Sequence, residues 1–67
     1  MTETVNEKIH KFRKAKKLTQ EQLGQKLGLT PQAVSKWEKG LTMPDILLLP
    51  ELCDIFGISI DDLLRTK

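Results

Sequence analysis

The sequence has very few of the residues from which catalytic sites and cross-links are built. Its 67 residues include one cysteine, Cys53, one histidine, His10, and no tyrosine. A single cysteine cannot close an intrachain disulfide, which excludes the cross-linked framework of many small secreted domains. So few ligands cannot assemble a metal site, or a nucleophile with its base. We therefore expect no catalytic residue, no metal site and no cofactor.

Long apolar runs are also missing. The longest, Ile46 to Leu49, is far too short to cross a bilayer, and the N-terminus lacks the apolar segment of a signal peptide. We expect no membrane association and a cytoplasmic protein. A chain of this length can form one domain, residues 1–67, whose folding would bury roughly 60% of the surface that the unfolded chain exposes. Its core must be purely hydrophobic, and it leaves no room for a deep catalytic cleft.

Charge is plentiful but unevenly distributed. Residues 1–17 hold six basic side chains against two acidic ones, a net charge of +4, whereas residues 18–40 carry +1 and residues 41–67 carry −3. Such asymmetry suggests that one end of the molecule faces a polyanion and that the other is turned away from it. The alternative is that the lysines from Lys8 to Lys17 form an ordinary solvated helix face.

Four helix starts can be recognised from their capping residues. A serine or threonine at the N-cap accepts a hydrogen bond from an unpaired backbone donor of the first turn, and the residue three positions later can bond back. Proline is tolerated at the first helical position because its missing donor is not needed there. The starts are Thr4 with Glu7, Thr19 with Gln22, Thr30 with Pro31, and Ser59 with Asp62.

Apolar residues recur at helical spacing after each start, and no segment alternates as a strand would. Pro50 cannot donate to the carbonyl of Ile46, so a loose turn is expected at residues 45–49, before a tighter helix that Gly57 closes. Trp37 and Cys53 lie on apolar edges, which favours core positions for both. The sequence thus predicts an all-α fold of five short helices, over about residues 5–16, 20–27, 31–39, 50–56 and 60–65.

Two of these helices are joined by a tight turn within residues 19–39, which read TQEQLGQKLGLTPQAVSKWEK. That arrangement is a helix-turn-helix. Gly28 suits the left-handed backbone that such a turn requires, and Gly24 suits a close crossing of the two helices.

The sequence resembles the phage repressor and Cro-type family of helix-turn-helix proteins, also called the Xre family. The resemblance covers residues 5–64, through LTQEQLGQKLGLTPQAVSKWEKG, the MPD turn and FGISIDDLL. It implies a lambda-repressor-like DNA-binding domain. In such a domain the helix that follows Thr30 lies in the major groove, and the preceding helix crosses above it.

The resemblance places base-reading side chains on the helix that follows Thr30. Gln32 stands where the family has a base reader, and glutamine can bond bidentately to adenine. Ser35 and Lys36 fall on the same face, where the lysine could bond guanine or only phosphate. Pro31 and Ala33 replace the more polar residues of some relatives, and apolar contact with a thymine methyl group is the role left to them. Stacking of Trp37 on a base is the alternative to its core position.

The resemblance also implies contacts with the DNA backbone. Gln20 corresponds to a glutamine that bonds phosphate, and Lys39 begins a segment that grips phosphate after the recognition helix. Arg13 corresponds to an arginine that pairs with the glutamate at Glu38, with a phosphate contact as a second role. His10 is expected to be a surface residue. The expected phosphate-contacting residues are Gln20, Thr30, Lys39, Thr42, Met43 and Arg13.

The expected function is sequence-specific binding of double-stranded DNA by a transcriptional regulator, most simply a repressor. The family commonly binds as a homodimer on half-sites about one helical turn apart, and Ile60, Leu64 and Leu47 are the expected dimer surface. Two alternatives stay open. In the first, the chain is the DNA-binding head of a longer ligand-sensing regulator. In the second, it is an antitoxin-type module that binds a protein partner. An enzyme is not expected.

Overall fold

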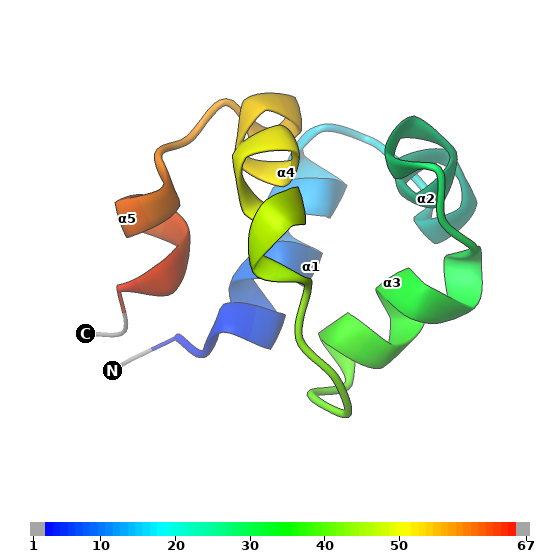
Figure 1. Ribbon diagram of the computed structural model, residues 1–67, viewed down its shortest axis with the longest axis horizontal. Helices are drawn as coiled ribbons and strands as arrows, with labels where there is room; N and C mark the ends of the chain where they lie inside the picture. Colours follow the sequence, from blue (N-terminus) through cyan, green and yellow to red (C-terminus); the bar gives the residue numbers. More distant parts are fainter. Residues whose placement is uncertain (1–2, 66–67) are drawn as a thin grey trace.

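The helices begin and end close to the positions that the capping residues predict. The computed structural model describes residues 3–65, which form five α-helices and one short 3₁₀ helix, η1 (Figure 1). No β-strand occurs in this part of the chain. The predicted all-α fold is therefore confirmed. The elements are α1 (Val5–Ala15), α2 (Gln20–Leu27), α3 (Pro31–Glu38), η1 (Ile46–Leu48), α4 (Leu49–Phe56) and α5 (Ile60–Leu64).

All four predicted N-caps make their hydrogen bonds. The hydroxyls of Thr4, Thr19 and Ser59 each accept a bond from the backbone N–H three residues later, and each cap N–H donates to the side chain at that later position. Thr30 accepts from the N–H of Ala33, after the proline at the first helical position. The helix starts are thus determined by local side-chain chemistry.

Three helices end one residue earlier than predicted. Lys16 is the C-cap of α1, and the next residue, Lys17, turns the chain with a left-handed φ of 59°. Lys39 is the C-cap of α3, and Arg65 is already extended after α5. Helix ends fray and are set by the direction in which the chain must leave, so patterns in the sequence locate them less sharply than the capped starts.

The opening of α4 follows the prediction made from Pro50. Residues 46–48 form the 3₁₀ helix, whose first turn is capped by Asp45, and the α-helix begins only at Leu49. No side chain caps α4, because the preceding turn already leads into it. Gly57 ends the helix in the left-handed conformation at φ 72°, as expected.

Every helix contributes to one hydrophobic core. Trp37 and Cys53 are both buried, as predicted. The rings of Phe12 and Phe56 pack with centroids 5.7 Å apart, which joins α1 to α4. None of the described helices has the length and apolar character that crossing a membrane requires. The buried apolar residues are Ile9, Leu23, Leu27, Val34, Trp37, Leu49, Leu52, Cys53, Phe56 and Leu63.

The turn between α2 and α3 depends on two glycines. Gly28 adopts φ 72°, the left-handed conformation predicted for it. A β-carbon at Gly24 would lie 2.8 Å from the backbone oxygen of Leu29 and 3.1 Å from that of Thr30. The close approach at Gly24 is therefore to the backbone of the turn, whereas the sequence predicted a crossing with α3 itself. A hydrogen bond of 2.7 Å from the Leu29 N–H to the Gly24 carbonyl closes this turn.

The acidic α5 lies on the opposite side of the molecule from the helix-turn-helix and beside the start of the basic α1 (Figure 1). In Figure 1, α1 and α4 occupy the centre, α2 and α3 lie on one side and α5 lies on the other. Lys8 fastens α5 to α1, because its Nζ donates to the backbone oxygen of Asp62 at 2.8 Å and to that of Arg65. No pattern in the sequence indicates this role for Lys8. The acidic α5 is thus held away from the helix-turn-helix.

Candidate nucleic-acid interface

One face of α3 is packed into the core and the opposite face is open. Val34 and Trp37 are buried, whereas Gln32 and Lys36, four residues apart and therefore on one face, are both exposed. Ser35 is half-buried beside them. The predicted base-reading residues therefore lie on the accessible side of a helix whose position is fixed from behind.

Pro31 and Ala33, the two predicted apolar contacts, are half-buried at the start of α3. Thr30, one residue earlier, is exposed, and its hydroxyl is engaged as the N-cap. The first turn of α3 thus exposes only part of its apolar surface beside the exposed amide of Gln32.

The segment after α3 forms an exposed loop that is anchored at its base. Gly40 turns the chain at φ 75°, and the N–H of Leu41 donates to the carbonyl of Lys36 at 2.9 Å. Asn6 of α1 lies against this turn, and its Nδ2 donates to the Glu38 backbone oxygen at 3.3 Å. The predicted phosphate contacts Lys39, Thr42 and Met43 are all exposed along this loop.

Arg13 and Glu38 form the predicted ion pair in a nearly buried position, with side chains only 9% and 7% exposed. The guanidinium donates from Nε to Glu38 Oε2 at 2.5 Å and from Nη2 to Oε1 at 3.1 Å. Its Nη1 donates to the Leu18 carbonyl at 2.7 Å. All three guanidinium nitrogens are therefore engaged within the protein, which favours the structural role of Arg13 over its second role as a phosphate contact.

Glu38 also binds side chains from the two other helices at this site. Gln20 of α2 donates from Nε2 to Glu38 Oε1 at 3.1 Å, and His10 of α1 places Nδ1 2.9 Å from the same oxygen. A carboxylate can only accept, so His10 must carry its proton on Nδ1 to make this bond. The carboxylate of Glu38 thus joins α1, α2 and α3.

His10 was expected to be a surface residue, because the sequence offers it no metal-ligand companions. Its side chain is indeed 54% exposed, but the contact with Glu38 was missed. A signal was present in the spacing, because His10 and Arg13 are three residues apart and so share a face of α1. Nothing in the pattern could indicate that Glu38 would meet that face.

The ionisation of Glu38 reflects two opposing effects. Burial disfavours the carboxylate and raises its pKa, whereas hydrogen bonds from Arg13, His10 and Gln20 and the charge of Arg13 lower it. The bonds prevail, and the pKa of Glu38 lies below its ordinary value. Glu38 is therefore charged when it holds Gln20 in place.

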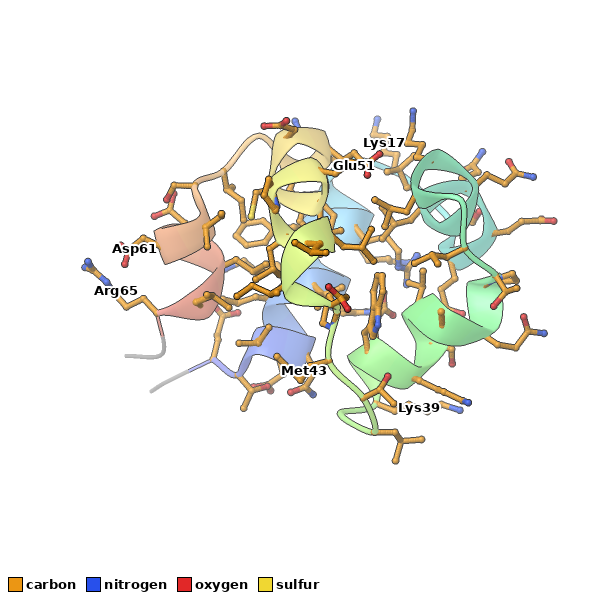
Figure 2. The ribbon with its side chains drawn as sticks, in the orientation of Figure 1. Lys17, Lys39, Met43, Glu51, Asp61 and Arg65 are labelled. Carbon is orange, nitrogen blue, oxygen red and sulfur yellow. The ribbon has the colours of Figure 1, made fainter. Side chains whose placement is uncertain are left out.

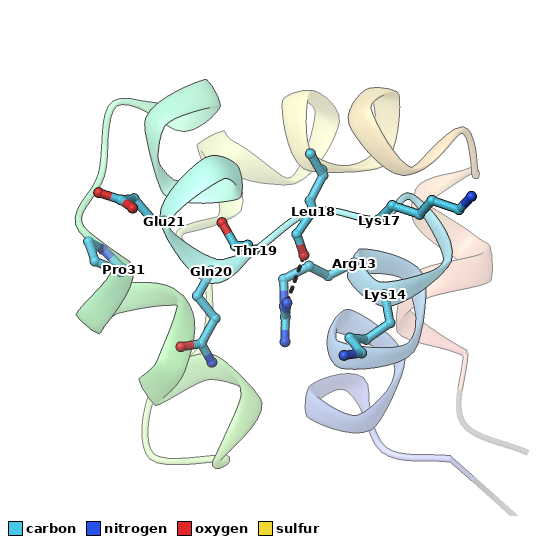
Figure 3. Close-up of a pocket in the computed structure, with 8 residues that line it drawn as sticks. All are labelled: Arg13, Lys14, Lys17, Leu18, Thr19, Gln20, Glu21 and Pro31. Carbon is cyan, nitrogen blue, oxygen red and sulfur yellow. Dashed lines mark hydrogen bonds between the residues drawn. The ribbon is translucent and has the colours of Figure 1, made fainter.

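An open groove runs beside this network, between the end of α1 and the start of α2 and α3 (Figure 3). Gln20 lies in the groove, and the amide atoms that do not bind Glu38 remain available there. The basic residues of the groove come from α1 and the turn after it. The lining residues are Arg13, Lys14, Lys17, Leu18, Thr19, Gln20, Glu21 and Pro31.

The structure thus contains two capped helices, α2 and α3, joined by a glycine turn. The outward face of α3 is polar, and a basic groove lies beside α2. The helix-turn-helix family model matches residues 9–63. The chain belongs to the helix-turn-helix family. The turn that defines this helix-turn-helix domain is the one closed by Gly24 and Gly28.

The helix-turn-helix domain is similar to several regulators. It is 42% identical over 59 residues to the HTH-type transcriptional activator BcrR of Enterococcus faecalis, an alignment that covers 88% of this chain and 29% of that protein. It is 40% identical over 60 residues to the HTH-type transcriptional regulator YqaE of Bacillus subtilis, covering 90% of this chain and 52% of that protein. The chain therefore spans only a part of the length of these two relatives.

A solved structure shares the whole fold. The domain superimposes on the P22 c2 repressor, crystallised in complex with synthetic operator 9T in the presence of Tl+, with a TM-score of 0.88 and 34% identity. The match covers 96% of this chain and 97% of the repressor chain. The resemblance to the phage repressor family and the lambda-repressor-like fold are thereby confirmed.

Proposed function

We propose that this helix-turn-helix domain binds double-stranded DNA in a sequence-specific manner and regulates transcription, with α3 in the major groove. The proposal is carried by the outward face of α3, where Gln32 and Lys36 are accessible while Trp37 anchors the helix from behind. The similarity to a repressor solved on operator DNA supports it. Such a regulator would act in the cytoplasm, with the DNA, and would need no cofactor or catalytic residue.

The proposed contacts divide into two kinds. Gln32, Ser35 and Lys36 would read base edges, with Pro31 and Ala33 against apolar groups. Phosphate contacts would fix the register of the helix in the groove without reading sequence. They would come from Gln20, Thr30, Lys39, Thr42 and Met43, with Arg13 acting chiefly through Glu38.

Replacing Gln32 and Lys39 separately tests this division. Gln32→Ala should cost about 1 to 3 kcal/mol of binding free energy on the preferred site and relax the preference at one base position. Lys39→Ala should weaken binding to all sequences evenly, because a phosphate contact carries no sequence information. Selection of bound duplexes from a random library, followed by titration of the selected site, measures both effects. Equal losses on every sequence for both variants would refute the assignment of Gln32.

We propose that the domain binds its site as a homodimer. Ile60 and Leu64 of α5 are exposed, and Leu47, at the junction with α4, is 86% exposed. One domain contacts too few base pairs to be selective alone, and a two-fold dimer would require half-sites about one turn apart. Sedimentation should show weak self-association that Leu47→Lys reduces. A strict monomer at high concentration, both free and on DNA, would rule the dimer out.

Whether the domain represses or activates transcription depends on how it affects other proteins when it is bound at a promoter. Repression is the expected direction, because a protein seated in the major groove excludes other proteins from the same site. A reporter gene placed behind the selected site would show lower expression with the protein than without it. Higher expression would instead indicate an activator, the role named for BcrR.

A further inference from the structure

The basic residues of the first 17 positions are not equivalent in the structure. Lys8 is bonded to the end of α5. Lys11 Nζ lies 2.9 Å from Glu3 Oε1. The Lys16 Nζ lies 3.6 Å from the position that a β-carbon on Gly57 would take, next to the C-terminus of α4. Lys8 and Lys11 thus bind other parts of the domain, and Lys16 lies beside the end of α4 and does not line the groove next to Gln20.

Lys14 and Lys17 differ from these three. Within residues 3–65 neither ammonium group makes an ion pair or a side-chain hydrogen bond, and both side chains line the groove beside Gln20. Arg13, the third basic residue of the groove, is already neutralised by Glu38. The unpaired positive charge of the groove therefore belongs to Lys14 and Lys17.

The position of Lys14 and Lys17 relative to α3 indicates a function for this unpaired charge. Pro31, the first residue of α3, lines the same groove, which therefore reaches from the proposed base-reading helix to the end of α1. Figure 3 shows the Lys14 ammonium turned back toward Arg13 and the Lys17 ammonium pointing outward from the rim. The one carboxylate of the groove, Glu21, lies on the α2 side, so an anion is favoured on the α1 side.

We propose that Lys14 and Lys17 form a second phosphate-binding segment, which extends the DNA contact from α3 across the groove onto the end of α1. The inference rests on the proposed DNA-binding function and deepens it. Lysine binds phosphate as a flexible point charge, which suits a backbone contact that reads no sequence. Lys17 and Lys39 lie on opposite sides of the molecule in Figure 2, so contacts at both would bracket α3 along the DNA.

Two double variants with the same net charge test the segment. Lys14→Gln with Lys17→Gly removes the proposed contacts, and glycine accepts the left-handed φ of residue 17 without strain. Lys11→Gln with Lys16→Gln removes the same amount of charge from the same stretch of chain, α1 and the turn after it, and is the matched control. Affinity for the selected duplex is measured as a function of salt concentration, after circular dichroism has shown that both variants are folded.

The first double variant should reduce the slope of log affinity against log salt by about 0.9 for each phosphate that the protein no longer neutralises. The control should leave the slope nearly unchanged. Lys14→Arg with Lys17→Arg, which keeps the charge, should retain the wild-type slope. Duplexes with single neutral methylphosphonate linkages then locate the contact. A linkage at the phosphate that Lys14 or Lys17 binds should weaken wild-type binding and have no further effect on the first double variant, whereas linkages at other contacted phosphates should weaken both proteins.

The outcomes separate the two proposals. Equal slopes for the two double variants, with the wild type still selecting a site, would overturn the phosphate segment and leave the DNA-binding function standing. Failure of the wild type to enrich any duplex would overturn the proposed function, and the segment with it. A slope lowered only in the first double variant supports both.

Discussion

Replacing Glu38 by alanine should destabilise the domain by about 3 to 5 kcal/mol, because it leaves the charge of Arg13 buried without its partner. A chain of 67 residues has a total stability of only about 3 to 10 kcal/mol, so a large fraction of the molecules should unfold. Gln20 and His10 lose their common acceptor in the same step. Urea denaturation followed by circular dichroism measures the loss.

Removing both charges is the control for this variant. Arg13→Met combined with Glu38→Leu should recover most of the stability, because a buried ion pair is often replaced by apolar side chains without loss. It should not recover DNA affinity, since Gln20 stays without its support. A loss below about 1 kcal/mol for Glu38→Ala would show that the pair behaves as a solvated surface pair instead.

The same carboxylate should make stability depend on pH. The pKa of Glu38 is lower in the folded chain than in the unfolded one, so its contribution is complete above the unfolded pKa and is lost as the pH falls through the folded pKa. Glu38→Gln should therefore show a weaker loss of stability on acidification than the wild type. Identical pH profiles for the two proteins would contradict this account.

Replacing Trp37 by alanine should cost about 3 to 5 kcal/mol of stability, because it removes a large buried side chain and leaves a cavity beneath α3. The indole is only 4% exposed and is packed in the core with Leu23 and Val34. A helix of eight residues is marginal in isolation, so α3 should lose its position together with this contact. Thermal and urea unfolding followed by circular dichroism measure the effect.

Gln32→Ala is the natural contrast, because it lies on the same helix with its side chain outside. It should leave stability nearly unchanged while altering DNA selectivity, whereas Trp37→Phe should keep most of both. Near-native stability of Trp37→Ala with loss of DNA binding alone would contradict the core role and favour stacking of the indole on a base.

Much of the fold follows from local chemistry that the sequence states directly. The capped starts at Thr4, Thr19, Thr30 and Ser59 depend only on residues three positions apart, whose side chains and backbone meet in the first turn of the helix. The left-handed Gly28 and the loose turn before Pro50 are equally local. Periodicity alone placed Trp37 inside, whereas Gln32 was assigned to the outward face through the family resemblance.

The candidate site follows only partly from such local chemistry. The pair of Arg13 with Glu38 was predicted through the family resemblance, because residues 25 positions apart give no local sign that they will meet. The addition of His10 and Gln20 to Glu38 was not predicted at all. Whether the four groups converge depends on how α1 and α2 pack against α3.

The sequence by itself determined the helices, their caps, the buried edge of each and the family, because these depend on spacing along the chain. Only the tertiary structure decided which charged groups are engaged. It assigned Lys8 to α5 across 54 residues, the side chains of His10 and Gln20 to the carboxylate of Glu38, and Lys14 and Lys17 to an open groove. The sequence around a lysine in a basic run carries no sign of which group faces that lysine in the folded chain. Its partner is set by the packing of helices that are distant in sequence.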